Sequence, residues 1–367
     1  MTLRVLSTFS GISAASCAWK PLGFEMVGYC EPAAYQAHVL NQRLGATAPR
    51  YLPKGKDFAP KKYEDIVGGS VPNFGDIEQI TDADLRALGR VDLLEGGSPC
   101  QSFSVAGLRK GLKDSRGNLA LAFAQLALRM REINGLRFVV WENVKGVLSD
   151  ETNGFGSLLA AMSGSEVALQ PPRGGWPSAG HVLVREREED PDECTCAWRV
   201  LDSQFFGVPQ RRDRVFLACS FDPAVDAGSI LFELDGESWN PSARRRSEQG
   251  ASAGGAGGAR ELIWPPVLGT LNASGAGMSR PAGQGNELDF VIVLSDGTVR
   301  RPTPVECERA QGFEDDWTAV EFLGRPATDM ERYRGIGNSM SVPVMEFIGY
   351  KLQRAVAAIE TEMKEAA

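Results

Sequence analysis

The sequence predicts an α/β protein with a doubly wound, mostly parallel sheet and a smaller, irregular, β-rich region. Three observations support this. Strand-like and helix-like segments alternate over the first 220 residues, as in βαβ units. The alternation stops after Phe221, and positions 250–258 contain only Gly, Ala and Ser. Apolar residues then return at helical spacing from Met345 to Ile359, which indicates a closing amphipathic helix.

The expected elements follow from the length and spacing of the apolar runs. The first strand is expected at Val5–Phe9, where a β-branched and apolar run ends in a Ser-Gly turn. The other expected elements are strands at 25–30, 91–94, 138–141, 199–202 and 214–218 and helices at 14–19 and 119–131. Only a short link separates the last two of these strands, so they are expected to form a hairpin.

Composition places the chain among ordinary globular proteins. It has 367 residues, of which 43% are hydrophobic and 23% charged, and it lacks both a signal-peptide pattern and a run of about 18 apolar residues. We therefore expect a cytoplasmic location and no membrane partner. The net charge of −8 is a weak argument against nucleic-acid binding, but arginine clusters in the C-terminal third leave that partner open.

The seven cysteines predict neither a disulfide framework nor a metal site. No CxxC pair occurs, and the chain has only two histidines. The nearest approach to a metal pair is Cys194-Thr195-Cys196, which we interpret as a surface loop. We expect no bound metal.

One cysteine stands where α/β enzymes place their chemistry. The apolar run Val91–Glu95 predicts a buried strand, and Gly96-Gly97-Ser98-Pro99-Cys100 follows it directly. Loops after the carboxyl ends of such strands carry active sites. Cys100 is therefore a candidate nucleophile, since an accessible thiol at this place can attack a substrate.

Two further strand ends predict a nucleotide-like cofactor. The turn Phe9-Ser10-Gly11-Ile12-Ser13 follows the first strand, and a glycine there lets backbone amides approach a ligand closely. Glu31 ends the second strand about 20 residues later, where an acid contacts ribose hydroxyls. Asp76 and the apolar Ile77 suit an adenine ring. No phosphate-binding P-loop occurs, so these residues favour an adenosyl cofactor.

Polar residues at three other places complete the candidate site. Glu142 ends a buried strand, although a Glu-Asn pair is also a common helix cap. Arg212 and Arg214 share one face of a strand, where they can converge on a carbonyl and a carboxylate or form structural ion pairs. Asn338 and Ser339 precede a helix, where they can close a pocket.

These motifs, in this order, resemble the DNA cytosine-5 methyltransferase family. The matching segments are Phe9-Ser10-Gly11, Gly97 to Ser104, Asp114 to Leu119, Glu142-Asn143-Val144, Phe206 to Phe216, Glu306, Arg309, Gln311-Gly312-Phe313 and Gly337-Asn338-Ser339. The resemblance implies a Rossmann-like methyltransferase core and S-adenosylmethionine as cofactor. It also implies methyl transfer to C5 of a flipped-out cytosine in a specific duplex DNA sequence, through a covalent bond between Cys100 and C6.

The resemblance also implies roles for individual residues. Glu142 contacts N3 and the exocyclic amine of the base, and Arg212 and Arg214 stabilise charge on its O2. The expected cofactor-binding residues are Phe9, Ser10, Gly11, Ile12, Ser13, Glu31, Asp76, Ile77, Pro99, Leu119, Asn338 and Ser339. The expected DNA-binding residues are Gln101, Ser104, Arg109, Lys110, Lys113, Thr270 and Leu271. Residues 1–220 and 328–367 would form the catalytic domain, and residues 221–327 the target-recognition domain.

One departure from the family pattern keeps alternatives open. Ser13 and Ala14 stand where the family has glycines. The chain could therefore be a catalytically inactive, adenosyl-binding DNA-recognition protein, and a transfer RNA cytosine-5 methyltransferase would use the same chemistry. The main hypothesis is an active monomeric enzyme on duplex DNA. It would belong either to a restriction-modification system, with a cognate restriction endonuclease as its partner, or to a phage that marks its own DNA.

Overall fold

The computed structural model describes residues 2–99, 119–162, 167–184, 194–232, 262–264, 271, 292–294 and 299–365. Its centre is a nine-stranded sheet in the order β3-β4-β2-β1-β5-β6-β9-β8-β7. The strands are β1 (Arg4–Thr8), β2 (Glu25–Cys30), β3 (Ala46–Tyr51), β4 (Val71–Gly75), β5 (Leu93–Gly96), β6 (Phe138–Val144), β7 (Ala179–Val184), β8 (Cys194–Asp202) and β9 (Asp213–Ser220). Neighbours from β3 to β6 are parallel, whereas β9, β8 and β7 add to β6 in antiparallel fashion. The predicted doubly wound, mostly parallel sheet is confirmed.

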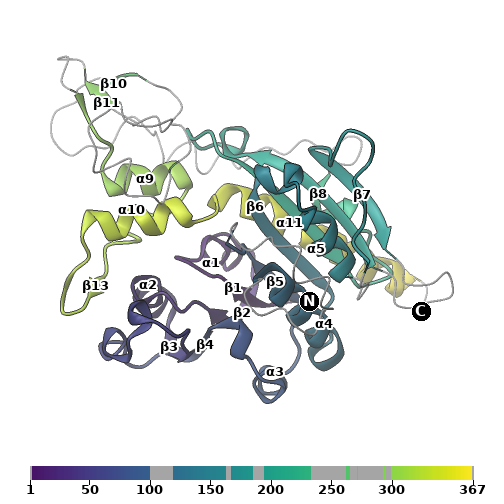
Figure 1. Cartoon of the computed structure of the whole chain (residues 1–367), viewed down its shortest axis with the longest axis horizontal. Coiled ribbons are helices and arrows are strands. Elements are labelled where there is room, and N and C mark those ends of the chain that lie inside the picture. The colour runs from purple at the N-terminus through teal and green to yellow at the C-terminus, as the bar shows by residue number, and fades with distance from the viewer. Residues whose placement is uncertain are drawn as a thin grey trace.

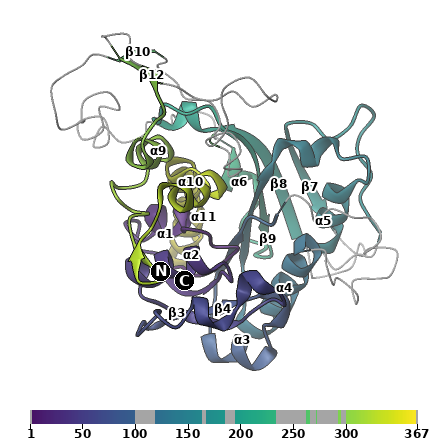
Figure 2. The same cartoon turned by 60° about the vertical axis from the view of Figure 1, so that its left-hand side comes forward.

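Helices cover both faces of this sheet, and Figure 2 shows the two layers on either side of the strands. One face packs against α1 (Ala14–Trp19), α2 (Ala34–Leu44), α6 (Gly228–Leu231) and the long α11 (Val342–Glu365). The other face packs against α3 (Asp82–Leu88), α4 (Leu119–Asn134) and α5 (Gly154–Met162). The apolar faces of these helices therefore build two cores, one on each side of the sheet.

A smaller group of elements lies beyond the end of the sheet near α2, as Figure 1 shows. It contains α9 (Pro304–Gln311), α10 (Asp329–Asn338) and the hairpin of β13 (Glu321–Phe322) and β14 (Arg325–Pro326). The three-stranded sheet of β10 (Leu262–Trp264), β11 (Ile292–Leu294) and β12 (Val299–Arg300) extends from α9. In this part of the chain, Thr303 and Thr328 each start a helix with a reciprocal capping box.

The expected elements of the sheet are present with small shifts at their ends. The helix predicted at 14–19 has these bounds, and the predicted hairpin is the antiparallel pair β8–β9. The interpretation of Cys194-Thr195-Cys196 as a surface loop is wrong. These residues begin β8, and both cysteines are fully buried because β8 is paired on both sides and packs against the second core.

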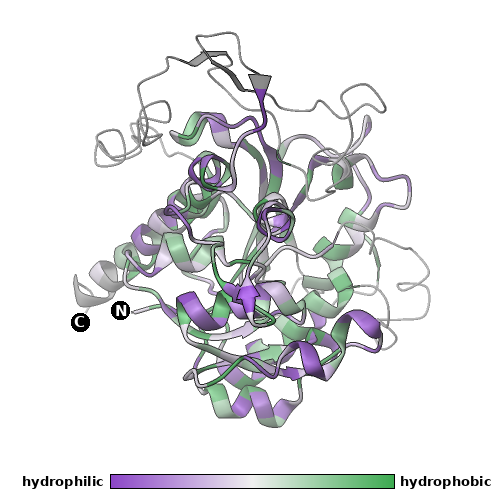
Figure 3. Ribbon diagram, turned by 90° about the vertical axis from the view of Figure 1, so that its left-hand side faces the viewer, coloured by the Kyte–Doolittle hydropathy of each residue, from purple (hydrophilic) through white to green (hydrophobic). Residues whose placement is uncertain are grey.

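Hydropathy follows the layers. In Figure 3 the helices around the sheet carry bands of hydrophobic and hydrophilic residues, as expected for helices with one face on a core. Among the described helices, none is both long and apolar enough to cross a membrane.

Candidate active site

The turn after β1 has an unusual backbone that Glu31 holds in place. Phe9, Gly11 and Ser13 all have positive φ angles, of 48°, 53° and 59°. The Glu31 carboxylate follows β2, and its two oxygens accept hydrogen bonds from the backbone N–H groups of Gly11 and Ala33, each at 2.8 Å. Burial raises the pKa of Glu31, and these two N–H groups oppose that rise. Each oxygen keeps a lone pair for a ligand hydroxyl.

Asp76 and Ile77 lie at the end of β4, beside the Glu31 loop. Asp76 caps a short 3₁₀ turn, with its Oδ1 accepting from the N–H of Glu78 at 3.1 Å. Gly75 precedes it with a φ of 74°, and a Cβ there would lie 2.0 Å from the Tyr51 carbonyl oxygen. Only glycine therefore allows the chain to bring Asp76 to this place.

Strand β6 anchors the segment that leads to the predicted nucleophile. The Asn143 side chain donates to the carbonyl of Ser98 at 2.8 Å, and the Trp141 indole N–H donates to the Ser98 hydroxyl at 3.1 Å. Ser98 is buried and Pro99 is exposed. Cys100 lies outside the described residues, but Ser98, two residues before it, is held by these two hydrogen bonds.

Glu142 and Arg214 form a largely buried ion pair. Their side chains are 12% and 16% exposed, and Arg214 Nε lies 3.2 Å from Glu142 Oε1. Burial raises the pKa of the Glu142 carboxyl, and the guanidinium groups of Arg214 and Arg212 oppose that rise. The alternative that Glu142 caps a helix is wrong, because it lies within β6 and Val144 stands at the start of the next helical turn.

Arg212 is held by backbone carbonyls from distant parts of the chain. It is 3% exposed and donates to the carbonyls of Leu271 at 3.1 Å, Gly337 at 3.2 Å and Ser339 at 2.7 Å. Gln311 donates to the Ser339 carbonyl as well, at 3.3 Å. These bonds place the end of α10, and with it Asn338, next to the active-site strands.

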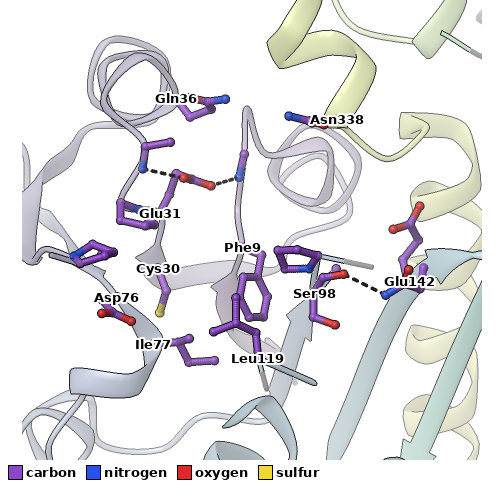
Figure 4. Close-up of a pocket in the computed structure, with 18 of the residues that line it drawn as sticks. Phe9, Cys30, Glu31, Gln36, Asp76, Ile77, Ser98, Leu119, Glu142 and Asn338 are labelled. Atoms are coloured by element: carbon purple, nitrogen blue, oxygen red, sulfur yellow. Dashed lines mark hydrogen bonds between the residues drawn. The ribbon is translucent and has the colours of Figure 1, made fainter. Parts of the chain in front are cut away.

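All of these groups meet in one cavity of about 810 Å³, within the usual range of ~300–1,000 Å³ for ligand pockets. Figure 4 shows Phe9 and Leu119 in its middle, with Glu31, Asp76 and Ile77 to one side and Glu142 to the other. The predicted site residues that line it are Phe9, Gly11, Glu31, Asp76, Ile77, Pro99, Leu119, Glu142, Arg212, Arg214 and Asn338.

The remaining predicted residues lie elsewhere or outside the described residues. The Ser10 hydroxyl donates to the carbonyl of Ser7 on β1, and the Ser13 hydroxyl accepts from the N–H of Ser16 on α1. Ile12 is fully buried, and the Ser339 carbonyl accepts from Arg212. Leu271 is buried at 5% exposure, so its side chain is part of the core. The predicted residues that the structure does not describe are Cys100, Gln101, Ser104, Arg109, Lys110, Lys113 and Thr270.

Sequence reasoning missed part of the cavity wall. Some of the missed residues lie one or two positions from predicted ones, namely Cys30, Pro32, Ala33, Gly75, Glu78, Gly97, Ser98, Asn143, Val144 and Gly337. Others had no signal in the sequence, because only folding brings them to the cavity: Gln36 on α2, Pro53 and Phe58.

A buried carboxyl that does not line the cavity was also missed. Glu95 is 2% exposed on β5, and its Oε2 accepts a hydrogen bond from the Ser7 hydroxyl at 2.7 Å. Burial raises its pKa to about 8, and the nearby Glu142 charge adds to this shift. Because Glu95 pairs with Val140 on β6, it lies on the same face of the sheet as Glu142, two residues farther along that strand.

Comparison with known proteins agrees with this geometry. The model of the family described as C-5 cytosine-specific DNA methylase matches residues 3–164 and 236–354. The chain belongs to this family. The family resemblance predicted from the motifs is therefore confirmed, and the match includes both the Pro99-Cys100 segment and the Glu142 strand.

Several known proteins are similar to this chain. The DNA N-6-adenine-methyltransferase of Escherichia phage P1 is 28% identical over 95% of this chain and 61% of its own length. The orphan methyltransferase M.Rho11sI of Bacillus phage rho11s is 34% identical over 59% of this chain and 32% of its own length. The chain thus spans less than two thirds of either relative.

The solved structure of the Entamoeba histolytica methyltransferase EhMeth has a TM-score of 0.55 and 13% identity. The match covers 97% of this chain and 99% of that one. At this identity the likeness concerns the fold alone, and it agrees with the methylase core described above.

The cavity fits the S-adenosylmethionine that this family uses. Its glycine turn leaves room for a ligand, and Ile77 and Phe9 supply an apolar wall on which an adenine can lie. The Glu31 carboxylate has lone pairs for ribose hydroxyls, and the acidic lining from Glu31, Asp76 and Glu78 suits a cationic sulfonium. These residues would hold the cofactor.

Proposed function

We propose that this chain methylates C5 of cytosine in duplex DNA, with S-adenosylmethionine as the methyl donor. One observation carries the proposal. A single cavity joins the Glu31–Asp76 end, which suits an adenosyl group, to the Glu142–Arg214 pair and to Pro99, directly before Cys100. Bound there, S-adenosylmethionine supplies a methyl group made electrophilic by its sulfonium centre.

The proposed chemistry starts with activation of the cytosine ring. C5 is too weak a nucleophile by itself, so the Cys100 thiolate adds to C6 and turns the ring into an enamine that reacts at C5. Glu142, whose pKa is raised by burial, donates its proton toward N3 and accepts from the exocyclic amine. C5 would then take the methyl group as its bond to the sulfonium sulfur breaks, which leaves a neutral thioether. Loss of the C5 proton to a base and of the thiolate from C6 restores the ring.

The two arginines have different parts in this proposal. Among the described residues, Arg214 is paired with the Glu142 carboxylate and the Asp213 carbonyl, and it lines the cavity. It is proposed to stabilise negative charge on the base O2. The terminal nitrogens of Arg212 donate to three backbone carbonyls, so its proposed role is to position the end of α10 and to add positive charge at the cavity wall.

The DNA partner is proposed from the family. A base in a duplex must be flipped out to reach the cavity. The predicted DNA-binding residues Gln101, Ser104, Arg109, Lys110 and Lys113 follow Cys100 directly in the sequence and are proposed to act in this step. Residues 221–327, with Thr270, are proposed to read the DNA sequence, and residues 1–220 and 328–367 to form the catalytic part. Leu271 is not proposed to contact DNA, because its side chain is buried in the core. We also propose that the protein is a monomer in the cytoplasm and that a cognate restriction endonuclease is its partner.

The test is methyl transfer from labelled S-adenosylmethionine to duplex DNA, with the product base identified by mass spectrometry. We expect 5-methylcytosine. N6-methyladenine as the product, the base in the name of the phage P1 relative, would overturn the proposal, as would label in transfer RNA alone. Absence of any transfer would favour a DNA-recognition protein without activity.

Two matched cysteine variants test the mechanism. Cys100→Ser is expected to abolish transfer, since a hydroxyl is far less nucleophilic than a thiolate at neutral pH. Cys307→Ser changes a buried cysteine on α9 that does not line the cavity, and it should keep near-normal activity. Full activity in Cys100→Ser would rule out the covalent step.

A further inference from the structure

Three buried cysteines meet on the sheet face that is covered by α4 and α5. Cys194 and Cys196 lie two residues apart on β8, so they point to the same face, and Cys219 is the direct partner of Cys196 on β9. Their Sγ atoms lie 3.7 Å apart for Cys194–Cys196 and 2.9 Å apart for Cys196–Cys219. All three sulfur atoms lie within 4.8 Å of one another. We call this group the β8–β9 cysteine cluster.

The cluster lies outside the proposed active site and has no part in its chemistry. None of its members lines the cavity, and each has no exposed surface. Isolated buried cysteines behave as small apolar residues. Here, however, the three thiol sulfurs lie close together. Three groups that can bind a metal ion are therefore found at one point in the core.

A cation bound to the cluster would displace protons from it. Cysteine binds a metal ion as the thiolate and not as the thiol, so each sulfur that becomes a ligand must lose its proton. The three sulfurs are close enough to share one ion, because all of them lie within 4.8 Å of one another.

The number of ligands in the cluster limits which metal ion it can bind. Within the part of the chain that the structure describes, no histidine or carboxylate oxygen joins the three sulfurs. Structural zinc almost always has four ligands. Thiolates without a fourth ligand suit a soft ion that accepts three sulfurs, and Cu⁺ is the soft first-row ion that thiolates select.

We propose that the β8–β9 cysteine cluster is a three-thiolate site for a soft, low-coordinate d¹⁰ cation, with Cu⁺ as the best match. Binding would form three metal–sulfur bonds and release the thiol protons, with no change of oxidation state. Sulfurs about 2.3 Å from a trigonal ion lie about 4.0 Å apart. Cys194 and Cys196 are close to that spacing, and a small side-chain rotation opens the Cys196–Cys219 pair by about 1 Å.

An ion bound to the cluster would cross-link β8 and β9, the hairpin that carries the proposed active-site arginines. β9 begins with Asp213 and Arg214 at one end and holds Cys219 near the other. The cross-link would stabilise the β8–β9 pair, in which Asp202 and Asp213 are opposite each other at the active-site end.

The first test is anaerobic titration of the reduced, full-length protein with Cu⁺ against a chromophoric Cu⁺ chelator. It is done in a Cys100→Ser background, so that the proposed nucleophile does not compete for the ion. We expect one equivalent to bind. Cys194→Ala, Cys196→Ala and Cys219→Ala should each weaken binding at least tenfold, whereas Cys307→Ala should not. Equal binding by all four variants would overturn the proposal.

A second measurement uses the unchanged chain and so does not depend on whether the variants fold. X-ray absorption at the copper edge should find three sulfur neighbours, and bound Cu⁺ should raise the Tm. Oxygen or nitrogen neighbours, or no bound copper, would contradict the site. A Cys196–Cys219 disulfide in the protein isolated without reductant, detected as a loss of two hydrogens by mass spectrometry, would also overturn it.

Discussion

Arg214 Nε lies 3.2 Å from Glu142 Oε1 on neighbouring antiparallel strands, and both side chains are largely buried. The register explains the contact. Arg214 is opposite Val144, which is two residues beyond Glu142 on the same face of β6. Two elements that are distant in sequence thus place a carboxyl and a guanidinium at one wall of the cavity. The charge of Arg214 opposes the rise in the pKa of Glu142, the proposed base-binding group.

Removal of the Arg214 charge should raise the pKa of Glu142. Burial already raises this pKa, and Arg214 is the largest opposing influence. Arg214→Gln should therefore shift the titration of the Glu142 carboxyl upward, as followed by carbon NMR with labelled glutamate. Methyl transfer should fall at least ~100-fold, the usual effect of losing one group that stabilises developing charge. Arg214→Lys is the control that keeps the charge, and it should show a smaller pKa shift.

Arg212 should matter for stability as much as for activity. Arg212→Met leaves the carbonyls of Leu271, Gly337 and Ser339 without this donor inside the protein. Loss of charged, buried hydrogen bonds of this kind should lower the free energy of unfolding by about 3 kcal/mol or more. Urea denaturation measures it. The adjacent, exposed Arg211→Met should change it by less than about 0.5 kcal/mol. Equal effects of the two variants would contradict this role.

Glu95 should make the protein less stable as the pH rises. Its pKa is about 8 in the folded chain, compared with an ordinary value of 4.5. Between these values the unfolded chain loses the proton and the folded chain keeps it, so the free energy of unfolding falls with rising pH. One pKa unit corresponds to ~1.4 kcal/mol.

Glu95→Gln removes this titration and keeps an acceptor for the Ser7 hydroxyl. The variant should gain stability relative to the unchanged chain at pH 8.5 and show a much smaller gain at pH 5. Urea denaturation at the two pH values checks this, with the exposed Glu64→Gln as the control. A gain of the same size at both pH values would show that the carboxyl does not titrate in this window.

Ser13 stands where the family has glycine. Its backbone has the left-handed conformation that favours glycine, and its hydroxyl caps the next helix. Its φ of 59° is left-handed, and its hydroxyl accepts from the N–H of Ser16 at the start of α1. Ser13→Gly loses the cap but relieves the backbone, so its stability should be nearly unchanged. Ser13→Ala keeps the strained backbone and loses the cap, so it should cost roughly 1–2 kcal/mol. Thermal unfolding of the pair decides this, and equal losses would contradict the argument.

Local patterns in the sequence were enough for six of the nine strands of the main sheet, for the helices α1, α4 and α11, and for the family. Strands such as β1 and β6 and the helix α1 follow from short apolar runs and turns, which act over a few residues. The chemistry-bearing residues were also visible. Parallel strands end at one edge of the sheet, so Glu31, Asp76 and Pro99 had to gather there, and the cavity confirms that they do.

Only the tertiary structure decided which partners these residues have. The carbonyl bonds that hold Arg212 join segments more than 50 residues apart, and the third member of the β8–β9 cysteine cluster comes from the neighbouring strand. Glu95 appeared as one more residue in an apolar run, and Cys194 and Cys196 as part of a loop. Burial and strand register depend on contacts between distant segments, and a local pattern of residues does not contain them.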